Sequence, residues 1–355
     1  MAPHRRVGIR AVHPFGRRVG VVTWRDAEMP HAAPFPVFLL STDLQKAKQV
    51  AETTARPIVT TRRLVFIPQP NGRVDMHRAL DGARVAEVRG SRLGGMVTDY
   101  PVVSMVAMPP FAVLALETED RPHSGNAIHN LFIQLTRTHR VHGPRESRVA
   151  RNRPLRTWWG MSKGAALASR GPTVVCASIS GFTWFDWGLE PRHAQFYDRS
   201  DRELKARAVY DVSLGPANAA HGLFENKVLI SCRSPGAKPV ALKPDMPFRD
   251  DDQGDAWKPL PGPAGLVALA PPGKILCFNA HGQLHWEFKR NGSAPALVVD
   301  GGILVEHDAA LFKLSWDGKF EHIWTAPEPL TARPLHHDGY WYVASTMGLH
   351  KLAPG

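Results

Sequence analysis

The sequence of 355 residues predicts an all-β chain folded as a single β-propeller, and its C-terminal third carries the main evidence. A similar phrase occurs there three times, beginning at Lys274, Pro295 and Pro334. Each copy alternates short apolar strands with tight turns that contain Asp-Gly or His-Gly. Strands that repeat every ~30 to 45 residues and are separated by glycine turns are typical of propeller blades.

The same phrase can be followed upstream, and its copies predict the number of blades. Candidate blades begin at Pro57, Pro101, Pro172, Ala219, Pro263, Pro295 and Pro334, at intervals of 44, 71, 47, 44, 32 and 39 residues. Seven blades are therefore favoured, with eight as the alternative, and the longest interval indicates an insertion. The last copy has only two clear strands, whereas a blade has four. We expect strands within residues 7–24 to pair with it, so that the two termini close one blade.

The segment from Ser41 to Thr54 departs from the strand pattern. Its sequence combines a polar cap with good helix formers, which predicts one short helix outside the ring. The 31 prolines and 30 glycines are dispersed as turn residues, so residues 1–355 are expected to form one domain. The three cysteines, Cys176, Cys232 and Cys277, lie in apolar runs without a CxxC motif, which predicts buried free thiols.

The charge balance is strongly basic, with 44 Lys and Arg residues against 32 Asp and Glu residues. A net charge of +12 favours acidic surfaces, anionic ligands or nucleic acid as partners. The most apolar stretch, residues 101–117, is interrupted by Pro109 and Pro110, so no membrane span is expected. Arginines divide the N-terminal region where a secretory signal would need an apolar run. A cytoplasmic location is the default expectation, with organelle targeting as the alternative, for a monomer or a subunit of a larger assembly.

A dense group of arginines falls inside the longest interval, in a basic insertion that we place at residues 136–160. Its seven members are Arg137, Arg140, Arg145, Arg148, Arg151, Arg153 and Arg156. Only one acid, Glu146, lies among them, which gives the segment a formal charge of +6. We expect this loop to bind a phosphate-bearing or acidic protein partner, nucleic acid included. A solvated insertion without a partner is the alternative.

Two of the repeats share a more specific signature. The turn Asp317–Lys319 is followed by Trp324, and the turn His281–Gln283 is followed by Trp286. This pattern resembles the quinoprotein, or PQQ-like, β-propeller repeat over residues 263–355, and Asp81-Gly82 is a weaker copy without the Trp. The resemblance implies a propeller that packs both tryptophans between blades, where truncation to Ala would cost about 3 to 5 kcal/mol. The family includes quinone-dependent dehydrogenases and non-catalytic scaffolds, so the resemblance indicates fold more than activity.

Cofactor and metal chemistry are not expected from these residues. The quinone-dependent members carry a vicinal cysteine pair, and this chain has no Cys-Cys sequence, so the resemblance implies a member that does not bind PQQ. His281 and His285 would share a helix face, but on a strand they stand about 13 Å apart and cannot bind one metal.

Four further residues are candidates for a channel or stacking site: Trp184, Trp187, His336 and His337. The two histidines precede Asp338-Gly339, which occupies the same place in its repeat as Asp300-Gly301, so a hairpin turn is favoured. The tryptophans are expected to pack in the core, with base or sugar stacking as the alternative.

We therefore predict a non-catalytic propeller scaffold that binds an anionic or protein partner. The alternative is an enzyme with its site in the central channel, of the polysaccharide lyase or hydrolase type, with a quinone-dependent dehydrogenase third. A channel cluster of His, Tyr and Arg with shifted pKa values would favour the enzyme. A channel lined by small apolar residues would favour the scaffold.

Overall fold

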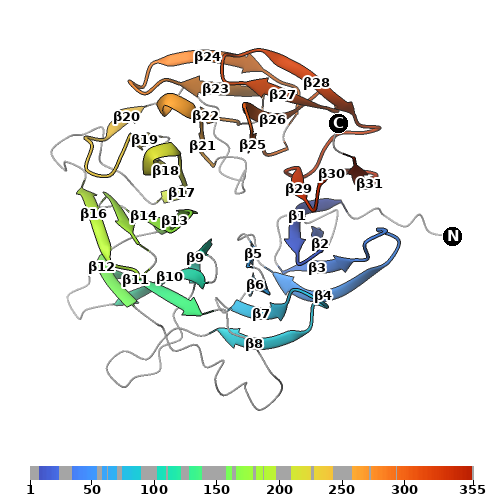
Figure 1. Ribbon diagram of the computed structural model, residues 1–355, viewed down its shortest axis with the longest axis horizontal. Helices are drawn as coiled ribbons and strands as arrows, with labels where there is room; N and C mark the ends of the chain where they lie inside the picture. The colour runs from blue at the N-terminus through green and yellow to red at the C-terminus, as the bar shows by residue number, and fades with distance from the viewer. Residues whose placement is uncertain are drawn as a thin grey trace.

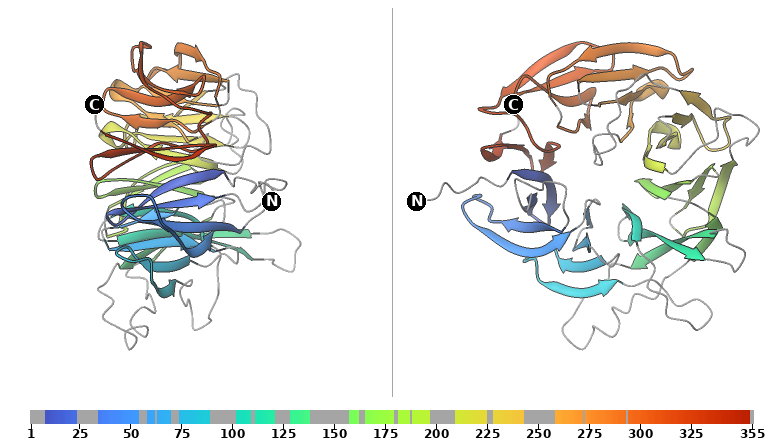
Figure 2. Two further views of the ribbon diagram at one scale, coloured as in Figure 1. Left: turned by 90° about the vertical axis from the view of Figure 1, so that its right-hand side faces the viewer. Right: turned by 180° about the vertical axis from the view of Figure 1, so that it is seen from behind.

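The computed structural model shows a ring of antiparallel sheets around a central axis (Figure 1). It describes residues 8–353 except 24–33, 54–57, 62, 70–73, 89–101, 109–110, 121–127, 138–156, 162–164, 179–180, 187, 197–208, 225–227, 243–257, 272 and 293. Figure 2 shows the ring from the side and from behind, with the strands running across its thickness. The predicted all-β propeller is confirmed.

Each sheet is formed by consecutive strands, and the first strand of each lies nearest the axis (Figure 1). Blade 1 contains β1 (Ile9–Phe15), β2 (Arg18–Thr23), β3 (Phe35–Leu40) and β4 (Ala47–Thr53); blade 2 contains β5 (Val59–Thr60), β6 (Leu64–Pro68), β7 (Val74–Arg78) and β8 (Arg84–Val88). Blade 3 contains β9 (Val102–Met108), β10 (Phe111–Asp120), β11 (Ile128–Arg137) and β12 (Thr157–Met161); blade 4 contains β13 (Ala165–Arg170), β14 (Thr173–Ser178), β15 (Gly181–Phe185) and β16 (Pro191–Phe196).

The second half of the ring follows the same plan. Blade 5 contains β17 (Val209–Leu214), β18 (Ala220–Phe224), β19 (Leu229–Cys232) and β20 (Val240–Leu242); blade 6 contains β21 (Leu260–Pro261), β22 (Val267–Leu269), β23 (Lys274–Phe278) and β24 (Leu284–Lys289). Blade 7 contains β25 (Leu297–Val299), β26 (Gly302–His307), β27 (Ala310–Ser315) and β28 (Phe320–Thr325); blade 8 contains β29 (Leu335–His337), β30 (Tyr340–Ser345) and β31 (Gly348–Leu352). Two short 3-10 turns, η2 (Pro216–Asn218) and η4 (Pro263–Gly265), join the first two strands of blades 5 and 6.

The described strands therefore form seven complete four-stranded blades and one C-terminal sheet of three strands. Seven complete blades correspond to the favoured count, and the three-stranded sheet occupies the eighth position that the alternative count required. Three predicted blade starts, at Pro172, Ala219 and Pro263, are displaced by one strand. The corresponding blades begin at Ala165, Val209 and Leu260, because in these three blades the proline- or alanine-led run that marks the predicted start precedes the second strand.

The expectation that the termini share one blade is wrong. Strand β1 pairs with β2, β2 pairs with β3, and β31 pairs with β30. Among the described strands, none from blade 1 is hydrogen-bonded to blade 8. Side chains join the two blades instead, because Val12 and Val21 of blade 1 share a buried apolar cluster with Tyr342 and Ala344 of blade 8.

The helix expected between Ser41 and Thr54 is also wrong. Residues Ser41–Lys46 form a turn, in which the Lys46 amide donates to Ser41 Oγ at 2.9 Å, and the chain returns as β4. This strand pairs along β3, and the hydroxyl of Thr53 donates a buried hydrogen bond to the Pro68 carbonyl at 2.9 Å. Pairing and packing outweigh the helix propensity of the residues between them.

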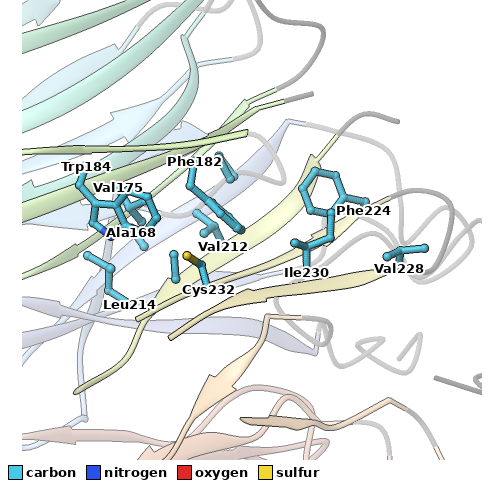
Figure 3. Close-up of a cluster of buried hydrophobic side chains, with 13 residues drawn as sticks. Ala168, Val175, Phe182, Trp184, Val212, Leu214, Phe224, Val228, Ile230 and Cys232 are labelled. Atoms are coloured by element: carbon cyan, nitrogen blue, oxygen red, sulfur yellow. The ribbon is translucent and has the colours of Figure 1, made fainter. Parts of the chain in front are cut away.

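The hydrophobic core lies in the layers between adjacent blades. The largest cluster joins blades 4 and 5, where Phe182 and Trp184 meet Val212, Phe224 and Ile230 (Figure 3). All five side chains are fully buried or nearly so. The three cysteines are free and buried, as the sequence predicts. Each blade thus buries both of its faces and depends on its neighbours for stability.

The predicted Asp-Gly hairpin turns are confirmed. His337 pairs with Tyr340, and Val299 pairs with Gly302, so each Asp-Gly pair forms a two-residue loop. Asp338 and Gly339 have φ values of 51° and 79°, the positive values that a primed turn needs.

Candidate functional site: the central channel

The inner strands of the propeller enclose a cavity of about 1190 Å³. Its walls come from β5, β9, β13, β17, β21 and β25, with Trp316 and Arg333 contributed by turns and linkers of blades 7 and 8. A cavity of this size, to which many blades contribute, is the usual place for a ligand in a propeller. The channel is therefore the first candidate site.

Hydroxyl groups fix the inner strands relative to one another. Ser104 Oγ of β9 accepts a hydrogen bond from the Leu167 amide of β13 at 3.0 Å. Ser169 Oγ of β13 donates to the Ala107 carbonyl of β9 at 2.6 Å. These bonds join blades 3 and 4 at the channel wall, so we assign the two hydroxyl groups a structural role.

The channel wall is built mainly from Ala, Val, Leu and Pro side chains. Blade 4 contributes Ala165, Ala166, Leu167 and Ala168, all buried. Blades 6 and 7 meet closely here: a Cβ added to Gly262 would lie 2.7 Å from the Trp316 ring. A channel lined mainly by small apolar residues is the feature that favours the scaffold over the enzyme alternative.

The charged side chains of the wall come from five different positions. They are Arg170, Asp211, Lys258, Asp300 and Arg333. Tyr210 lies beside them and is 39% exposed. The described residues that line the cavity include no histidine and no cysteine. The wall thus offers anion-binding groups and two carboxylates, but not the histidine-centred cluster that the enzyme alternative would use.

The most strongly perturbed histidine lies outside the channel wall. His221 of β18 is 2% exposed, and burial lowers its pKa to about 4. Its Nδ1 lies 2.9 Å from Ser231 Oγ on the neighbouring strand. A histidine beside a serine is a common base and nucleophile pair, but these two residues lie in the interior of the blade and outside the channel wall. We assign it a structural role.

No group of His, Cys, Asp and Glu suited to a metal occurs among the residues that the structure describes. His281 contacts Arg233 on blade 5, with its Nδ1 3.0 Å from the guanidinium. His285, one position into β24, is exposed. Within the same residues, no helix has the length and apolar character needed to cross a membrane.

The basic segment begins and ends in blade 3. Arg137 is the last residue of β11, and Thr157 is the first residue of β12. The other six arginines, Arg140, Arg145, Arg148, Arg151, Arg153 and Arg156, lie outside the described residues. In a four-stranded meander, the connection between the third and fourth strands starts at the same end of the ring as the first hairpin. The end of β11 and the start of β12 therefore lie on the side of the ring that carries the Asp338-Gly339 turn.

The four candidate stacking residues are dispersed. Trp184 is 1% exposed in the blade 4–5 core, and its Nε1 donates to the Asn218 carbonyl at 2.9 Å. Trp187 lies outside the described residues. His336 is exposed and stacks on Trp341 with ring centroids 4.6 Å apart, while His337 is partly buried beside the hairpin turn. None of the three described residues lines the channel cavity.

Several polar residues of the channel were not predicted as site residues from the sequence. Tyr210, Lys258 and Arg333 lie in inner strands or just before them, whereas the visible repeat begins one strand later in blades 5 and 6. A corrected repeat phase would have placed Tyr210 and Lys258 on the channel side.

The two tryptophans of the repeat lie between blades, as expected, but they are only partly buried. Trp286 of blade 6 donates from Nε1 to the Trp316 carbonyl of blade 7 at 2.9 Å. Its ring lies against Gly318, where an added Cβ would be 3.4 Å away. Partial burial lowers the cost expected for truncation below the range for a fully buried side chain.

Comparison with known proteins supports the fold. No protein-family model matches the chain, and no curated protein matches its sequence. Among solved structures, BamB from Moraxella catarrhalis is similar with a TM-score of 0.56 and 12% identity, over 99% of this chain and 97% of that one. The computationally designed Ika8 protein is similar with a TM-score of 0.60 and 10% identity, over 98% and 97% of the two chains.

A third similar structure is apo AztD from Citrobacter koseri, with a TM-score of 0.54 and 10% identity over 91% of this chain and 87% of that one. In all, 897 solved chains match, including a designed protein, so the likeness shows the propeller fold and does not select an activity.

Proposed function

We propose that this protein is a non-catalytic interaction scaffold of the PQQ-like propeller type, which binds an anionic or protein partner. The observation that carries the proposal is the channel wall, which is built mainly from small apolar residues and includes three cations and two carboxylates but no described histidine or cysteine. The contact of Trp286 in β24 with the turn residues Trp316 and Gly318 of the next blade supports the resemblance to this repeat family.

The basic segment, which runs from Arg137 at the end of β11 to the start of β12, is the proposed docking site for that partner. Seven arginines against one acid give a formal charge of +6, half of the net charge of the chain. The segment joins the two outermost strands of blade 3, away from the strands that form the channel. A phosphate-bearing or acidic surface would therefore bind at the rim of the ring and leave the blade core unchanged.

The test compares two variants of equal net charge. In the first, Arg145, Arg148, Arg151 and Arg153 are replaced by Gln; in the control, the exposed residues Lys46, Lys48, Lys238 and Lys289 are replaced by Gln. Binding of a fluorescein-labelled 20-nucleotide single-stranded DNA and of polyglutamate is measured by anisotropy across a salt series.

We expect the arginine variant to bind both probes more weakly than the control, with unchanged Tm. For the DNA probe, the slope of log affinity against log salt should fall by about 0.7 for each phosphate that is no longer neutralised. Equal affinities and slopes in the two variants would show that general charge, and not this segment, attracts anions.

A further inference from the structure

The two halves of the channel wall differ in how their inner strands are joined. In blades 1–4, hydroxyl groups bridge neighbouring inner strands. Thr60 of β5 donates to the Pro14 carbonyl of β1 at 2.7 Å. Ser104 and Ser169 join β9 to β13 in the same way. The inner strands of blades 5–8, which occupy the other half of the ring (Figure 1), contain only one Ser or Thr residue, Ser213.

The inner strands of blades 5–8 present open edges to the channel. Each is the first strand of its sheet, and an edge strand carries N–H and C=O groups that no neighbouring strand pairs. Ser213 of β17 lines the same cavity and is 4% exposed, and its Oγ has no hydrogen-bond partner among the described residues. Buried polar groups are normally hydrogen-bonded, so this half of the wall favours a ligand rich in hydroxyl groups.

The direction of the inner strands assigns the polar wall residues to the two mouths of the channel. Four antiparallel strands return the chain to the side on which a blade began, so successive inner strands run in the same direction. In agreement, the turns η2 and η4, which follow β17 and β21, lie in contact. Tyr210 lies at the start of β17, and Lys258 and Arg333 lie two positions before β21 and β29. All three therefore belong to the mouth at which the inner strands begin, which we call the strand-start mouth.

The two mouths differ in charge. At the strand-start mouth, two cations, Lys258 and Arg333, stand against one carboxylate, Asp211, which gives a formal charge of +1. At the opposite mouth, Arg170 at the end of β13 is balanced by Asp300 after β25. Lys258 is partly buried and forms no hydrogen bond or ion pair with a residue that the structure describes. An anionic group is therefore favoured at the strand-start mouth.

Tyr210 supplies an aromatic face at this mouth. It is 39% exposed and lines the cavity. A tyrosine ring combines an apolar face with a polar tip, which suits the apolar C–H face and the hydroxyl groups of a sugar ring. Ser213 lies three residues further along β17, about 10 Å deeper at ~3.3 Å per residue. A ligand that reaches both residues must therefore be longer than a single small acid.

We propose that the channel binds an acidic disaccharide at the strand-start mouth. Lys258 and Arg333 bind its carboxylate, and Tyr210 stacks on the first sugar ring. The hydroxyl groups bond to Ser213 and to the open edges of the inner strands. The cavity of about 1190 Å³ is large enough, because small-molecule sites commonly measure ~300 to 1,000 Å³. This site is separate from the basic segment and goes beyond the scaffold role.

The test measures binding of digalacturonate to the full chain by isothermal titration calorimetry. Cellobiose, a neutral disaccharide, tests the need for charge, and succinate, a small dianion, tests the need for the sugar. Lys258→Gln removes a cation from the strand-start mouth. Arg170→Gln removes one from the opposite mouth of the same cavity and is the control of equal charge change.

We expect digalacturonate to bind at least about tenfold more tightly than cellobiose or succinate, since only digalacturonate uses both the cations and the open strand edges. Lys258→Gln should weaken digalacturonate binding at least about tenfold with an unchanged Tm, whereas Arg170→Gln should stay within about threefold of the parent. Tyr210→Leu should weaken binding more than Tyr210→Phe, which retains the ring.

Absence of digalacturonate binding, or equally tight binding of cellobiose or succinate, would overturn the proposal. A loss in Arg170→Gln as large as that in Lys258→Gln would also overturn it, because general attraction by positive charge would then explain both. The outcome can be separated from the arginine test. The arginine variant should bind digalacturonate as the parent does, and Lys258→Gln should bind DNA as the parent does.

Discussion

Replacing Glu306 by Ala should destabilise the propeller more than any other single carboxylate change among the described residues. Glu306 is 3% exposed at the end of β26. Its Oε2 accepts a hydrogen bond from the Ala294 amide at 3.0 Å, and its Oε1 accepts one from the Leu330 amide at 2.7 Å. Ala294 precedes blade 7 and Leu330 precedes blade 8, so one carboxylate fixes the chain on both sides of its own blade.

The magnitude follows from the groups that the substitution exposes. Glu306→Ala leaves two buried amides without an acceptor, and each costs about 1 to 3 kcal/mol, which gives a loss of about 2 to 6 kcal/mol. The charge of Glu306 also favours the buried guanidinium of Arg290, whose pKa burial lowers to about 10. Glu306→Gln retains one carbonyl acceptor and should lose about half as much.

The assay is urea unfolding at 25 °C with the exposed change Glu321→Ala as control. Free energies of unfolding should fall in the order parent, Glu306→Gln, Glu306→Ala, while Glu321→Ala should lie within about 0.5 kcal/mol of the parent. A buried carboxylate also pays a desolvation cost, so its removal could in principle stabilise the fold. Equal or greater stability of Glu306→Ala would show that this cost exceeds the two hydrogen bonds and would refute the reasoning.

Three further predictions concern the blade interiors. Burial lowers the pKa of His221 to about 4 in the folded protein, whereas the unfolded chain binds a proton at this residue near pH 6.5. The free energy of unfolding should therefore fall by roughly 3 kcal/mol between pH 6.5 and 4. In urea titrations, His221→Gln should make this decline smaller. Burial raises the pKa values of Cys176, Cys232 and Cys277 to about 12, 11 and 12. Mass spectrometry should therefore find no alkylated thiol in the folded protein at pH 8, and three alkylated thiols in urea. Alkylation of these thiols without urea would contradict their burial. Trp286→Ala, which removes a partly buried ring and its hydrogen bond to blade 7, should cost about 2 kcal/mol in thermal melts, and a parental Tm would remove its packing role.

The propeller could be predicted because its strands and turns are local. Asp338-Gly339 forms the expected two-residue loop with positive φ values at both positions, which Asp and Gly tolerate better than most residues. The first blade could not be predicted in the same way. Residues 47–53 favour a helix by propensity, and only pairing with β3, more than ten positions away for Thr53 and Phe35, makes them a strand.

The candidate sites were predictable to different degrees. The basic segment can be recognised from its arginine content alone, and the sequence predicts that it is an insertion within a blade. The strands β11 and β12 of blade 3 end and begin on either side of it. The channel residues depend on which strand of each blade is innermost. The repeat phase was displaced by one strand in blade 5, so Tyr210 was not recognised as facing the axis.

Every sheet formed by the described strands is encoded by one continuous stretch of chain, because none of these strands is exchanged between the first and last blades. Many closed rings would lose a sheet if their ends were moved. Here, new chain ends placed in any linker between blades would leave all sheets whole, provided that the present N- and C-termini were joined by a flexible tether. The blades can therefore be reordered or duplicated as separate genetic modules, and the fold is open to growth by insertion of further blades.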